Sequence, residues 1–384
     1  MLRILEVLVL SGITVFVAFY TTYLTICIFC LRRRAPHPTR TEEYSTVSII
    51  IPTYNEANVI QRKIENLETL HYPKGKLDII FVDGGSTDET VELLEKHAKQ
   101  RKLPLKIVEQ GSRKGFNNAV IDGFAASSGD IICVTGAETE YDRDALKLMI
   151  DHFVDPKIGA VTGRVEMKNP RKEYSPRLEG AYRNLYDLVR AAESRIDSVF
   201  DIKGEVSAAR RSVMLNLTQK PELQYKGAID TCISFEARMQ GYKAIYEPNA
   251  VYFELAPSSL RDSLKQQKRR AAALIENLVA FRNMILRRKF GAFGMLIMPA
   301  HFLMLVVLPL LLLTSLIGLI VLVILDPTNV LPLTIILLSL SVSFVFVSVQ
   351  AFLKTQLALI TALFGMLFGI ETQKFERISS TRTL

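Results

Sequence analysis

The stretch Val47-Ser-Ile-Ile-Ile-Pro-Thr-Tyr-Asn-Glu56 and the stretch Leu77-Asp-Ile-Ile-Phe-Val-Asp-Gly-Gly-Ser-Thr-Asp88 decide the fold. Each is a short β-branched apolar run that stops at a polar cluster, which is typical of a fully buried parallel strand. Apolar residues recur at helical spacing across Asn58–Leu70 and predict a helix between the strands. Ligands of such a βαβ unit bind beyond the carboxyl ends of its strands. We therefore expect Thr53–Glu56 and Asp83–Ser86 to meet at one binding edge.

This edge suits a nucleotide. The carboxylate of Asp83 can accept hydrogen bonds from a base or a ribose, and Gly84 and Gly85 let the backbone come close to a ligand. The alternative interpretation of the same residues is an ordinary βα turn, rich in residues that favour turns.

Composition narrows the class of protein. The 384 residues allow one soluble domain together with membrane elements. The net charge is +8, yet 49% of the residues are hydrophobic, so we expect no nucleic-acid partner. The basic residues lie beside apolar segments, which indicates a membrane surface carrying anionic lipid. The four cysteines and five histidines form neither a disulfide framework nor a zinc pattern, and they fit a reducing compartment.

Apolar segments flank the predicted soluble domain. Residues 4–31 are long enough to cross a bilayer, and they end at Arg32-Arg33-Arg34, which the charge bias of membrane proteins places in the cytosol. A linker at 32–46 leads to a domain at 47–258, where strands and helices alternate as in a mostly parallel sheet covered on both faces. We expect basic amphipathic interface helices at 259–290, transmembrane and interfacial helices at 291–372, and a basic cytosolic tail at 373–384.

The C-terminal apolar region is expected to cross the membrane more than once. Gly291–Leu325 is too long for one straight crossing and contains two prolines. We expect an entry segment in the membrane plane, a span at about His301–Leu325 and a return crossing at Leu331–Leu353. Gln356–Ile370 is expected to lie in the interface or to re-enter, with a further crossing as the alternative. The pattern predicts a multi-pass protein of the cell membrane whose soluble domain is cytoplasmic.

Several motifs resemble a known family. Ile51-Pro-Thr-Tyr-Asn-Glu56, Val82-Asp-Gly-Gly-Ser-Thr-Asp88 and Ser128-Gly-Asp-Ile-Ile132 look like those of inverting glycosyltransferases of family 2, including membrane-anchored transferases acting on polyprenyl phosphates and cellulose or hyaluronan synthases. The resemblance continues through Asp155-Pro-Lys-Ile-Gly-Ala-Val-Thr-Gly163, Gly204-Glu-Val-Ser-Ala-Ala-Arg-Arg211 and Gly241-Tyr-Lys-Ala-Ile-Tyr-Glu-Pro248. It implies an α/β GT-A fold, a UDP- or GDP-sugar donor and usually a divalent metal, Mg²⁺ or Mn²⁺.

The family carries an Asp-x-Asp after its fourth strand. Here that position reads Gly136-Ala137-Glu138, so the first acid is missing and the second is a glutamate. The resemblance implies that Glu138 ligates the metal and that Gly136 and Ala137 lie beside the donor; hard cations take carboxylate and phosphate oxygens. The alternative is a solvated acid in a surface loop. The glycine also leaves open a degenerate, inactive member of the family.

The family's general base is an aspartate at a helix N-terminus. In Gly227-Ala-Ile-Asp-Thr-Cys-Ile-Ser-Phe-Glu236 that residue is Asp230, and Ile229 replaces the usual glutamate. Sugar transfer requires such a base because the acceptor hydroxyl must lose its proton. The alternative is that Asp230 is only a helix N-cap, a common role for this residue type.

A third motif follows in the basic region. Lys265-Gln-Gln-Lys-Arg-Arg270 resembles the family's Gln-x-x-Arg-Trp, with Gln266 and Arg269 matching and Arg270 in place of the tryptophan. The resemblance implies that these three residues bind the donor, and Arg269 suits a diphosphate because its guanidinium is a planar fork. In processive synthases the tryptophan meets the acceptor sugar. The alternative is a basic helix face on lipid headgroups. The resemblance assigns to the donor, in addition, Pro52, Thr53, Tyr54, Glu56, Asp83, Gly85 and Lys114.

The sequence thus predicts a membrane-bound inverting glycosyltransferase that moves a sugar to a lipid-linked acceptor. Two alternatives stay open: a processive synthase that extends a glycan, and a degenerate membrane protein that only binds nucleotide-sugar. Under the main hypothesis Thr53, Asp83, Glu138 and Asp230 line a single pocket open to the inner leaflet. The sugar, the acceptor and the oligomeric state do not follow from the sequence.

Overall fold

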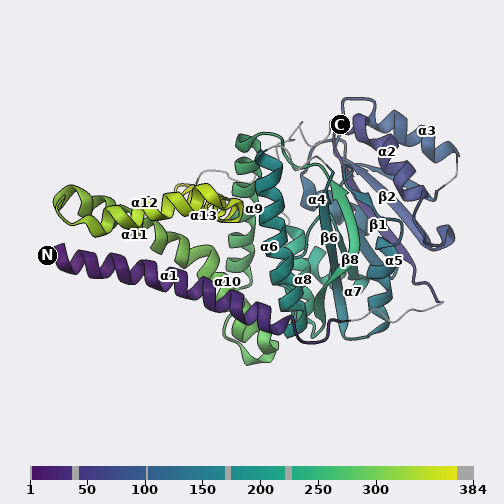
Figure 1. Ribbon diagram of the computed structural model, residues 1–384. Coiled ribbons are helices and arrows are strands. Elements are labelled where there is room, and N and C mark those ends of the chain that lie inside the picture. Colours follow the sequence, from purple (N-terminus) through teal and green to yellow (C-terminus); the bar gives the residue numbers. More distant parts are fainter. Residues whose placement is uncertain (1, 37–42, 101–102, 169–173, 221–226, 370–384) are drawn as a thin grey trace.

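A computed structural model describes residues 2–36, 43–100, 103–168, 174–220 and 227–369; the predicted basic tail at 373–384 lies outside them. Figure 1 shows a domain built on a β-sheet, from which an arm of long helices extends to one side. The predicted α/β class is confirmed.

The sheet has eight strands in the order β3-β2-β1-β4-β7-β6-β8-β5. The pairs β1/β2, β1/β4, β2/β3 and β6/β8 are parallel, whereas β7 runs antiparallel to both of its neighbours and β5 antiparallel to β8. The expected mostly parallel sheet is therefore present. The strands are β1 Val47–Thr53, β2 Leu77–Asp83, β3 Leu105–Glu109, β4 Ile131–Val134, β5 Glu140–Tyr141, β6 Ile158–Met167, β7 Ser207–Arg210 and β8 Lys243–Glu254.

Helices cover both faces of the sheet. In β1, the fully buried Ile50 packs into one core with α4, while Ile49 and Ile51 pack into a second core with α2. Burying each such side chain contributes about 1.5–3 kcal/mol, which explains why β1 is apolar on both sides. The helices of the domain are α2 Ala57–Glu68, α3 Thr90–Gln100, α4 Phe116–Ala125, α5 Ala145–Ile150, α6 Tyr174–Ile196, α7 Arg211–Thr218, α8 Ile229–Met239 and α9 Leu260–Ala280.

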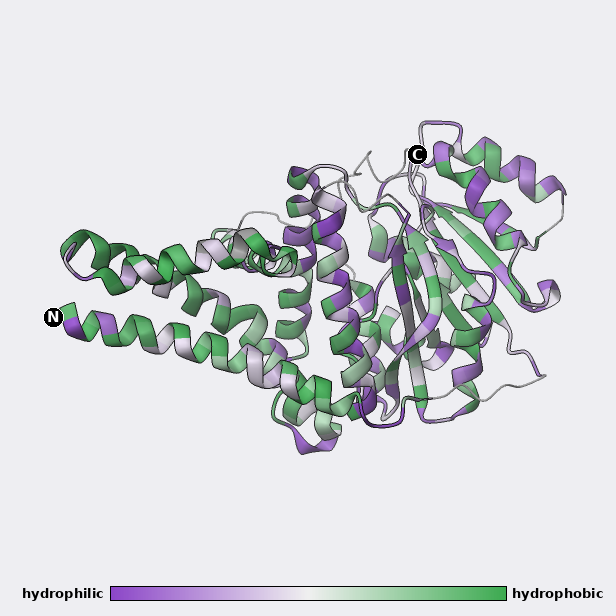
Figure 2. Cartoon of the chain, viewed as in Figure 1, coloured by the Kyte–Doolittle hydropathy of each residue, from purple (hydrophilic) through white to green (hydrophobic). Residues whose placement is uncertain are grey.

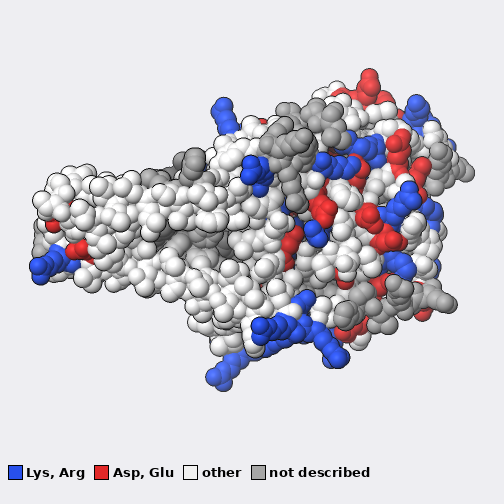
Figure 3. All heavy atoms as spheres, viewed as in Figure 1, with Lys and Arg blue, Asp and Glu red and all other residues white. Residues whose placement is uncertain are grey.

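The arm is apolar over most of its length (Figure 2). Among the described residues three helices are long and apolar enough to cross a membrane: α1 Leu2–Cys30, the helix Phe293–Leu325 and α13 Val347–Leu367. The helix between the last two, α12 Val330–Val345, contains a shorter apolar segment. On the face shown in Figure 3, charged side chains lie at the tip and at the base of the arm but not between them. This distribution fits an arm surrounded by lipid.

Two boundaries in the arm differ from the prediction. The helix Phe293–Leu325 is continuous, so the expected division near His301 is wrong. It comprises α10 Met298–Phe302 and α11 Leu308–Leu325, each with a proline in its first turn, and each preceded by a π-helical segment, Phe293–Ile297 and Leu303–Val307. Proline removes one backbone donor and crowds the preceding turn, and widening that turn lets the helix continue.

The return segment is also interrupted earlier than expected. The backbone is extended at Phe346, between α12 and α13, and α13 then runs without a break through Lys354. The expected crossing Leu331–Leu353 and the expected interfacial segment Gln356–Ile370 are therefore not separate units, because α13 includes parts of both. α13 packs against α9 and α6.

A buried carboxylate ties the arm to the domain. Glu193 of α6 is 1% exposed and accepts a hydrogen bond from the Tyr23 hydroxyl of α1 at 2.7 Å. Its Oε1 also lies 2.6 Å from Nε2 of His301 in α10, and its Oε2 accepts the backbone N–H of Phe200 at 2.8 Å. Burying a carboxylate is costly unless it is fully hydrogen-bonded, and this one has three partners. One side chain thus joins three segments far apart in the sequence.

Candidate functional site

The ends of β1 and β2 meet as predicted. Thr53 and Asp83 are register partners at the carboxyl ends of the two parallel strands. The hydroxyl of Thr53 lies 3.3 Å from the carbonyl of Val82 and 3.5 Å from Oδ1 of Asp83. The preceding Pro52 continues β1 and Tyr54 follows it, so all of these residues lie at one edge of the sheet.

Asp83 organises the turn that follows β2. Its Oδ2 accepts the backbone N–H groups of Gly85 at 2.9 Å and of Ser86 at 2.8 Å, and its Oδ1 accepts the Ser86 hydroxyl. Gly85 has a φ of +79°, a conformation that glycine adopts without strain. The side chain of Asp83 is only 2% exposed. The turn-forming role is therefore observed, and a contact with a nucleotide would use the lone pairs that remain.

The adjoining loops restrain the other predicted donor residues. The Arg113 guanidinium carbon lies 4.4 Å above the ring of Tyr54, so one face of this ring already stacks on a cation. Glu56 is buried, and its backbone N–H donates to the Thr90 hydroxyl at 2.8 Å. Lys114 is half-exposed and lies 3.9 Å from Asp122. Arg113 and Lys114 both precede α4 and were both considered as phosphate contacts from the sequence, whereas the stacking of Arg113 on Tyr54 is seen only in the structure.

Gly136 and Glu138 fill one another's space. A Cβ added at Gly136 would lie 2.8 Å from Oε2 of Glu138, so the glutamate carboxylate folds back to where a side chain at 136 would be. The two departures from Asp-x-Asp thus belong together, because Glu138 can take this position only when residue 136 has no side chain. Ala137 between them is buried.

A fully buried lysine, which was not predicted from the sequence, bonds to both ends of the loop that carries Glu138. Lys63 of α2 is 0% exposed, and its ammonium donates to the Thr139 carbonyl at 2.6 Å and to the Thr135 hydroxyl at 3.2 Å. It also lies 4.8 Å from the ring centre of Tyr141. Burial lowers the pKa of Lys63 to about 7, against the attraction of nearby carboxylates, Glu138 foremost. Both ends of the Glu138 loop are therefore fixed by one cation.

Asp230 lies in the first turn of α8. The helix begins at Ile229 and its N-cap is Ala228, so the alternative that Asp230 is the N-cap is wrong. Its Oδ1 accepts the N–H of Thr231 at 2.8 Å, and a Cβ added at Gly204 would lie 2.5 Å from its Oδ2. The pKa of Asp230 is raised to about 7, chiefly by burial and next by the negative charge of Glu205, with a smaller contribution from Asp201. A carboxyl with this pKa suits proton transfer near neutrality.

Arg270 makes two ion pairs at the place of the family's tryptophan. Its Nη1 lies 3.1 Å from Oε1 of Glu179, and its Nη2 lies 3.2 Å from Oε1 of Glu205. Burial alone would raise the pKa of Glu205, but the positive charges of Arg270 and, to a smaller extent, Arg183 lower this pKa to about 2. The nearby Gln266 has a buried Oε1 without a hydrogen-bond partner, and Arg269 is half-buried. An unsatisfied buried amide oxygen is a place where a bound ligand would supply a donor.

Sheet topology brings these separate pieces to the same edge. β4 ends at Val134, whose register partner Ser207 begins the antiparallel β7. The loop carrying Glu138 follows β4, and the Gly204–Glu205 segment precedes β7, so both emerge beside the ends of β1 and β2. Asp230 joins them through its contact with Gly204. The shared edge is what the sequence predicted, and the roles of the individual residues stay predictions.

The donor set fits a metal held jointly with a ligand. No group of three or more His, Cys, Asp or Glu side chains is arranged around a common point in the described part of the chain. Glu138 would therefore provide one carboxylate oxygen, and diphosphate and water would complete the coordination shell. Mg²⁺ is commonly bound in this way, through one or two carboxylates plus phosphates.

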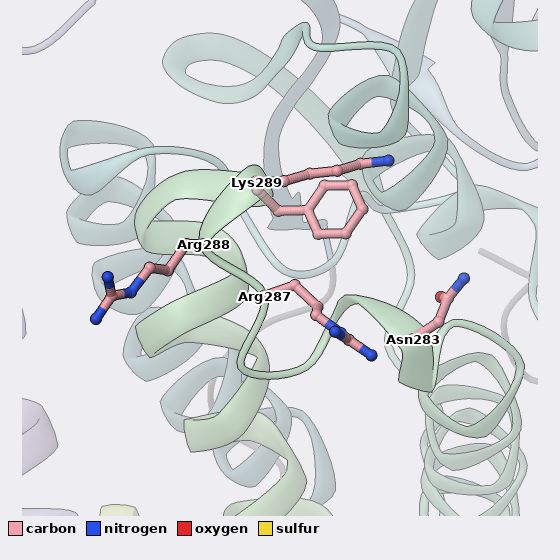
Figure 4. Close-up of a pocket in the computed structure, with 5 residues that line it drawn as sticks. Asn283, Arg287, Arg288 and Lys289 are labelled. Atoms are coloured by element: carbon pink, nitrogen blue, oxygen red, sulfur yellow. The ribbon is translucent and has the colours of Figure 1, made fainter.

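A hollow of about 370 Å³ lies elsewhere, at the base of the arm. It is lined by Asn283, Arg287, Arg288, Lys289 and Phe290, shortly before the helix that begins at Phe293 (Figure 4). In Figure 4 the side chains of Arg288 and Lys289 point in opposite directions, so they do not converge on one ligand. The hollow shares no residue with the candidate site.

Comparison with known proteins agrees with this architecture. Residues 48–216 match the family model "Glycosyl transferase family 2". The chain is 27% identical over 229 residues to a poly-beta-1,6-N-acetyl-D-glucosamine synthase of Staphylococcus aureus, covering 59% of this chain and 54% of that protein. It is also 27% identical over 232 residues to the probable glycosyltransferase YdaM of Bacillus subtilis, covering 59% and 55%. The match spans about half the length of these relatives.

A solved structure resembles nearly the whole chain. It is the mannosyltransferase PcManGT from Pyrobaculum calidifontis in complex with GDP-Man and Mn²⁺, with a TM-score of 0.81 and 25% identity. The similarity covers 96% of this chain and 100% of that one. The described sheet, the match of residues 48–216 to the glycosyltransferase family 2 model and this likeness agree with one another, and together they indicate a glycosyltransferase domain of GT-A fold.

Proposed function

We propose that the protein is a membrane-bound inverting glycosyltransferase that transfers a sugar from a nucleotide-sugar to a lipid-linked acceptor. The observation that carries the proposal is the placement of Asp230, a carboxyl with a pKa raised to about 7, on Gly204 at the sheet edge where the strand ends converge. GDP-mannose is the first donor to test, because PcManGT was solved with GDP-Man and Mn²⁺. UDP-sugars stay in the panel, since the donor base is not assigned.

In this proposal Asp230 accepts the proton of the acceptor hydroxyl as that oxygen attacks the anomeric carbon, and the sugar's configuration inverts. Pro52, Thr53 and the turn organised by Asp83 hold the nucleotide, and the Arg269 guanidinium contacts the diphosphate. A divalent cation at Glu138, when bound, neutralises charge on the leaving diphosphate. Lys63 keeps the Glu138 loop in place through its bonds to Thr135 and Thr139.

The acceptor assignment rests on the position of the site relative to the arm. Helices with the length and composition of membrane spans precede and follow the domain, and α9 connects the site to them. We infer that the domain faces the cytoplasm, because the end of α1 nearest to it is followed by Arg32, Arg33 and Arg34. A lipid-linked hydroxyl or phosphate in that leaflet is then the acceptor closest to the site.

A processive synthase is the second candidate, and the names of the Staphylococcus aureus relatives favour it. Against it stands Arg270, which occupies the tryptophan position and is ion-paired to Glu179 and Glu205. The residue at this position therefore offers no aromatic ring to stack on a growing chain. A degenerate binding protein, the third possibility, is distinguished only by activity.

The test uses purified full-length protein in lipid nanodiscs with a panel of radiolabelled nucleotide-sugars, Mn²⁺ or Mg²⁺, and polyprenyl phosphate acceptors. We expect transfer of one sugar, and Asp230→Asn should keep nucleotide affinity but lose turnover. Asp155→Asn, at an exposed turn, is the matched control. A ladder of long products on a gel would favour the synthase; nucleotide binding without any transfer would favour the degenerate protein. Transfer by Asp230→Asn at the parent rate would overturn the base assignment.

A further inference from the structure

A chain of charged side chains, of which Lys354 and Glu179 are buried and Arg270 and Glu205 half-buried, runs from the arm to the candidate base. Lys354 of α13 is 8% exposed; its ammonium lies 3.8 Å from Oε2 of Glu179 in α6 and donates to the Ser263 hydroxyl of α9 at 2.7 Å. Glu179 is fully buried, and its Oε1 pairs with Arg270 of α9. Arg270 in turn pairs with Glu205. Four side chains thus link a candidate membrane helix to the loop before β7.

The last link lies next to the residue that faces Asp230. Glu205 directly follows Gly204, where an added Cβ would lie 2.5 Å from Oδ2 of Asp230. Glu205 also acts on Asp230 through its like charge. The guanidinium of Arg270 therefore fixes the position of this loop and neutralises the carboxylate nearest to the base.

Asp230 is surrounded by charged side chains of both signs, so the removal of one of these charges should change the pKa of Asp230. On its own side of the site, Glu205 and Asp201 are negative, and Lys203, Arg183 and Arg270 are positive. Glu179 forms ion pairs with Arg183, Arg270 and Lys354, and Arg183 also pairs with Glu254 of β8. Removing one partner of a buried pair leaves the other charge uncompensated, because the low dielectric does not screen it.

We propose that Arg270 and Lys354 are positioning residues: the chain Lys354–Glu179–Arg270–Glu205 fixes the Gly204–Glu205 loop against Asp230 and thereby couples the seating of α13 to the base. This inference rests on the proposed function, because it takes Asp230 as the base. It explains why an arginine stands where the family has a tryptophan: here the side chain at this position completes a chain of ion pairs. It also means that α13 acts on the chemistry without contacting substrate.

The experiment is the pH dependence of kcat in nanodiscs for the parent, Arg270→Gln, Glu205→Gln and Lys354→Met. Arg270→Gln removes a positive charge near Glu205, so the midpoint should move to higher pH by about one unit, which lowers kcat at pH 6 about tenfold. Glu205→Gln should move the midpoint to lower pH. Lys354→Met should move it in the direction of Arg270→Gln by a smaller amount, and Lys354→Arg should restore it.

Two controls separate the possible failures. Ser263→Ala keeps every charge of the chain and should leave the midpoint unchanged, although it removes the hydrogen bond to Lys354. If Arg270→Gln does not fold, Lys354→Met at the far end still tests the coupling. Midpoints equal to the parent's in Arg270→Gln, Glu205→Gln and Lys354→Met would overturn the proposal while Asp230→Asn stays inactive. Activity in Asp230→Asn would instead overturn the proposed function.

Discussion

Replacing Gly204 with alanine should impair the base while leaving the fold intact. Gly204 does not have a positive φ, so alanine fits its backbone, and the obstacle is the Asp230 carboxylate. The new Cβ would lie 2.5 Å from Oδ2 and 3.2 Å from Cγ, whereas ordinary contact begins at 3.4 Å. The carboxylate must therefore move by about 1 Å, and a displacement of that size in a reacting group costs about 100-fold in rate.

The assay measures kcat and the KM for donor at saturating acceptor, together with nucleotide affinity by calorimetry and the Tm of the protein in nanodiscs. We expect kcat to fall about 100-fold, with the donor KM and the Tm close to the parent values. Gly75→Ala is the matched control, because a Cβ there meets nothing within 4 Å. A Gly204→Ala variant with parent kcat, alongside an inactive Asp230→Asn, would refute the argument that the observed carboxylate position is the working one.

The remaining predictions concern protonation, metal and lipid. If Asp230 is the base, as proposed, it must be ionised to act, so kcat should rise about tenfold per pH unit below its pKa of about 7 and level off above it. Between the ordinary pKa of 3.8 and about 7, the folded state holds a proton on Asp230 that the unfolded state does not. The contribution of this proton to the free energy of unfolding is fully present below pH 3.8 and is lost as the pH rises through 7. The free energy of unfolding of Asp230→Asn, measured by chemical denaturation, should lack this pH dependence. Glu138→Gln should raise the dissociation constant of Mn²⁺ in the presence of nucleoside diphosphate about tenfold or more, measured by electron paramagnetic resonance without turnover, and an unchanged constant would place the metal elsewhere. The exposed cations Arg287, Arg288 and Lys289 lie at the base of the arm. Anionic phospholipid should therefore raise the Tm of the parent, but not that of a variant in which all three are changed to glutamine. The charge-matched control changes the exposed Lys76, Lys96 and Lys99 to glutamine.

Most of the sheet was predictable because its strands carry the apolar, β-branched residues that burial on both faces requires. β1 and β2 are examples, and their polar ends met where expected. β7 had no such signal: Ser207-Ala-Ala-Arg210 is a run of small residues, and it becomes a strand because β4 and β6 lie on either side of it. The prolines of the helix Phe293–Leu325 were misread as a break, because π-helical turns absorb them.

The candidate site was predictable in outline but not in its internal charges. Lys63 falls on the apolar stripe of α2, between Ile60 and Ile64, and a lysine at such a position is a sequence signal of a buried cation. Its partners, the Thr139 carbonyl and the Thr135 hydroxyl, lie more than 70 residues away and carry no signal of their own. Arg270 was expected to bind donor, and only the three-dimensional structure reveals its two carboxylate partners.

The contacts of Glu193 have a consequence for how the proposed enzyme would reach a lipid-linked acceptor. Because Tyr23, His301 and Phe200 all contact this one side chain, a rotation of the arm against the domain at that point would break these contacts. The distance between Asp230 and a bilayer around the arm would then be set by how the arm helices pack on the domain, and not by movement of the domain relative to the arm. Under the proposed function, a lipid-linked acceptor would have to reach this edge of the sheet by extending from the bilayer, so the length of the lipid would limit which acceptors the protein can use.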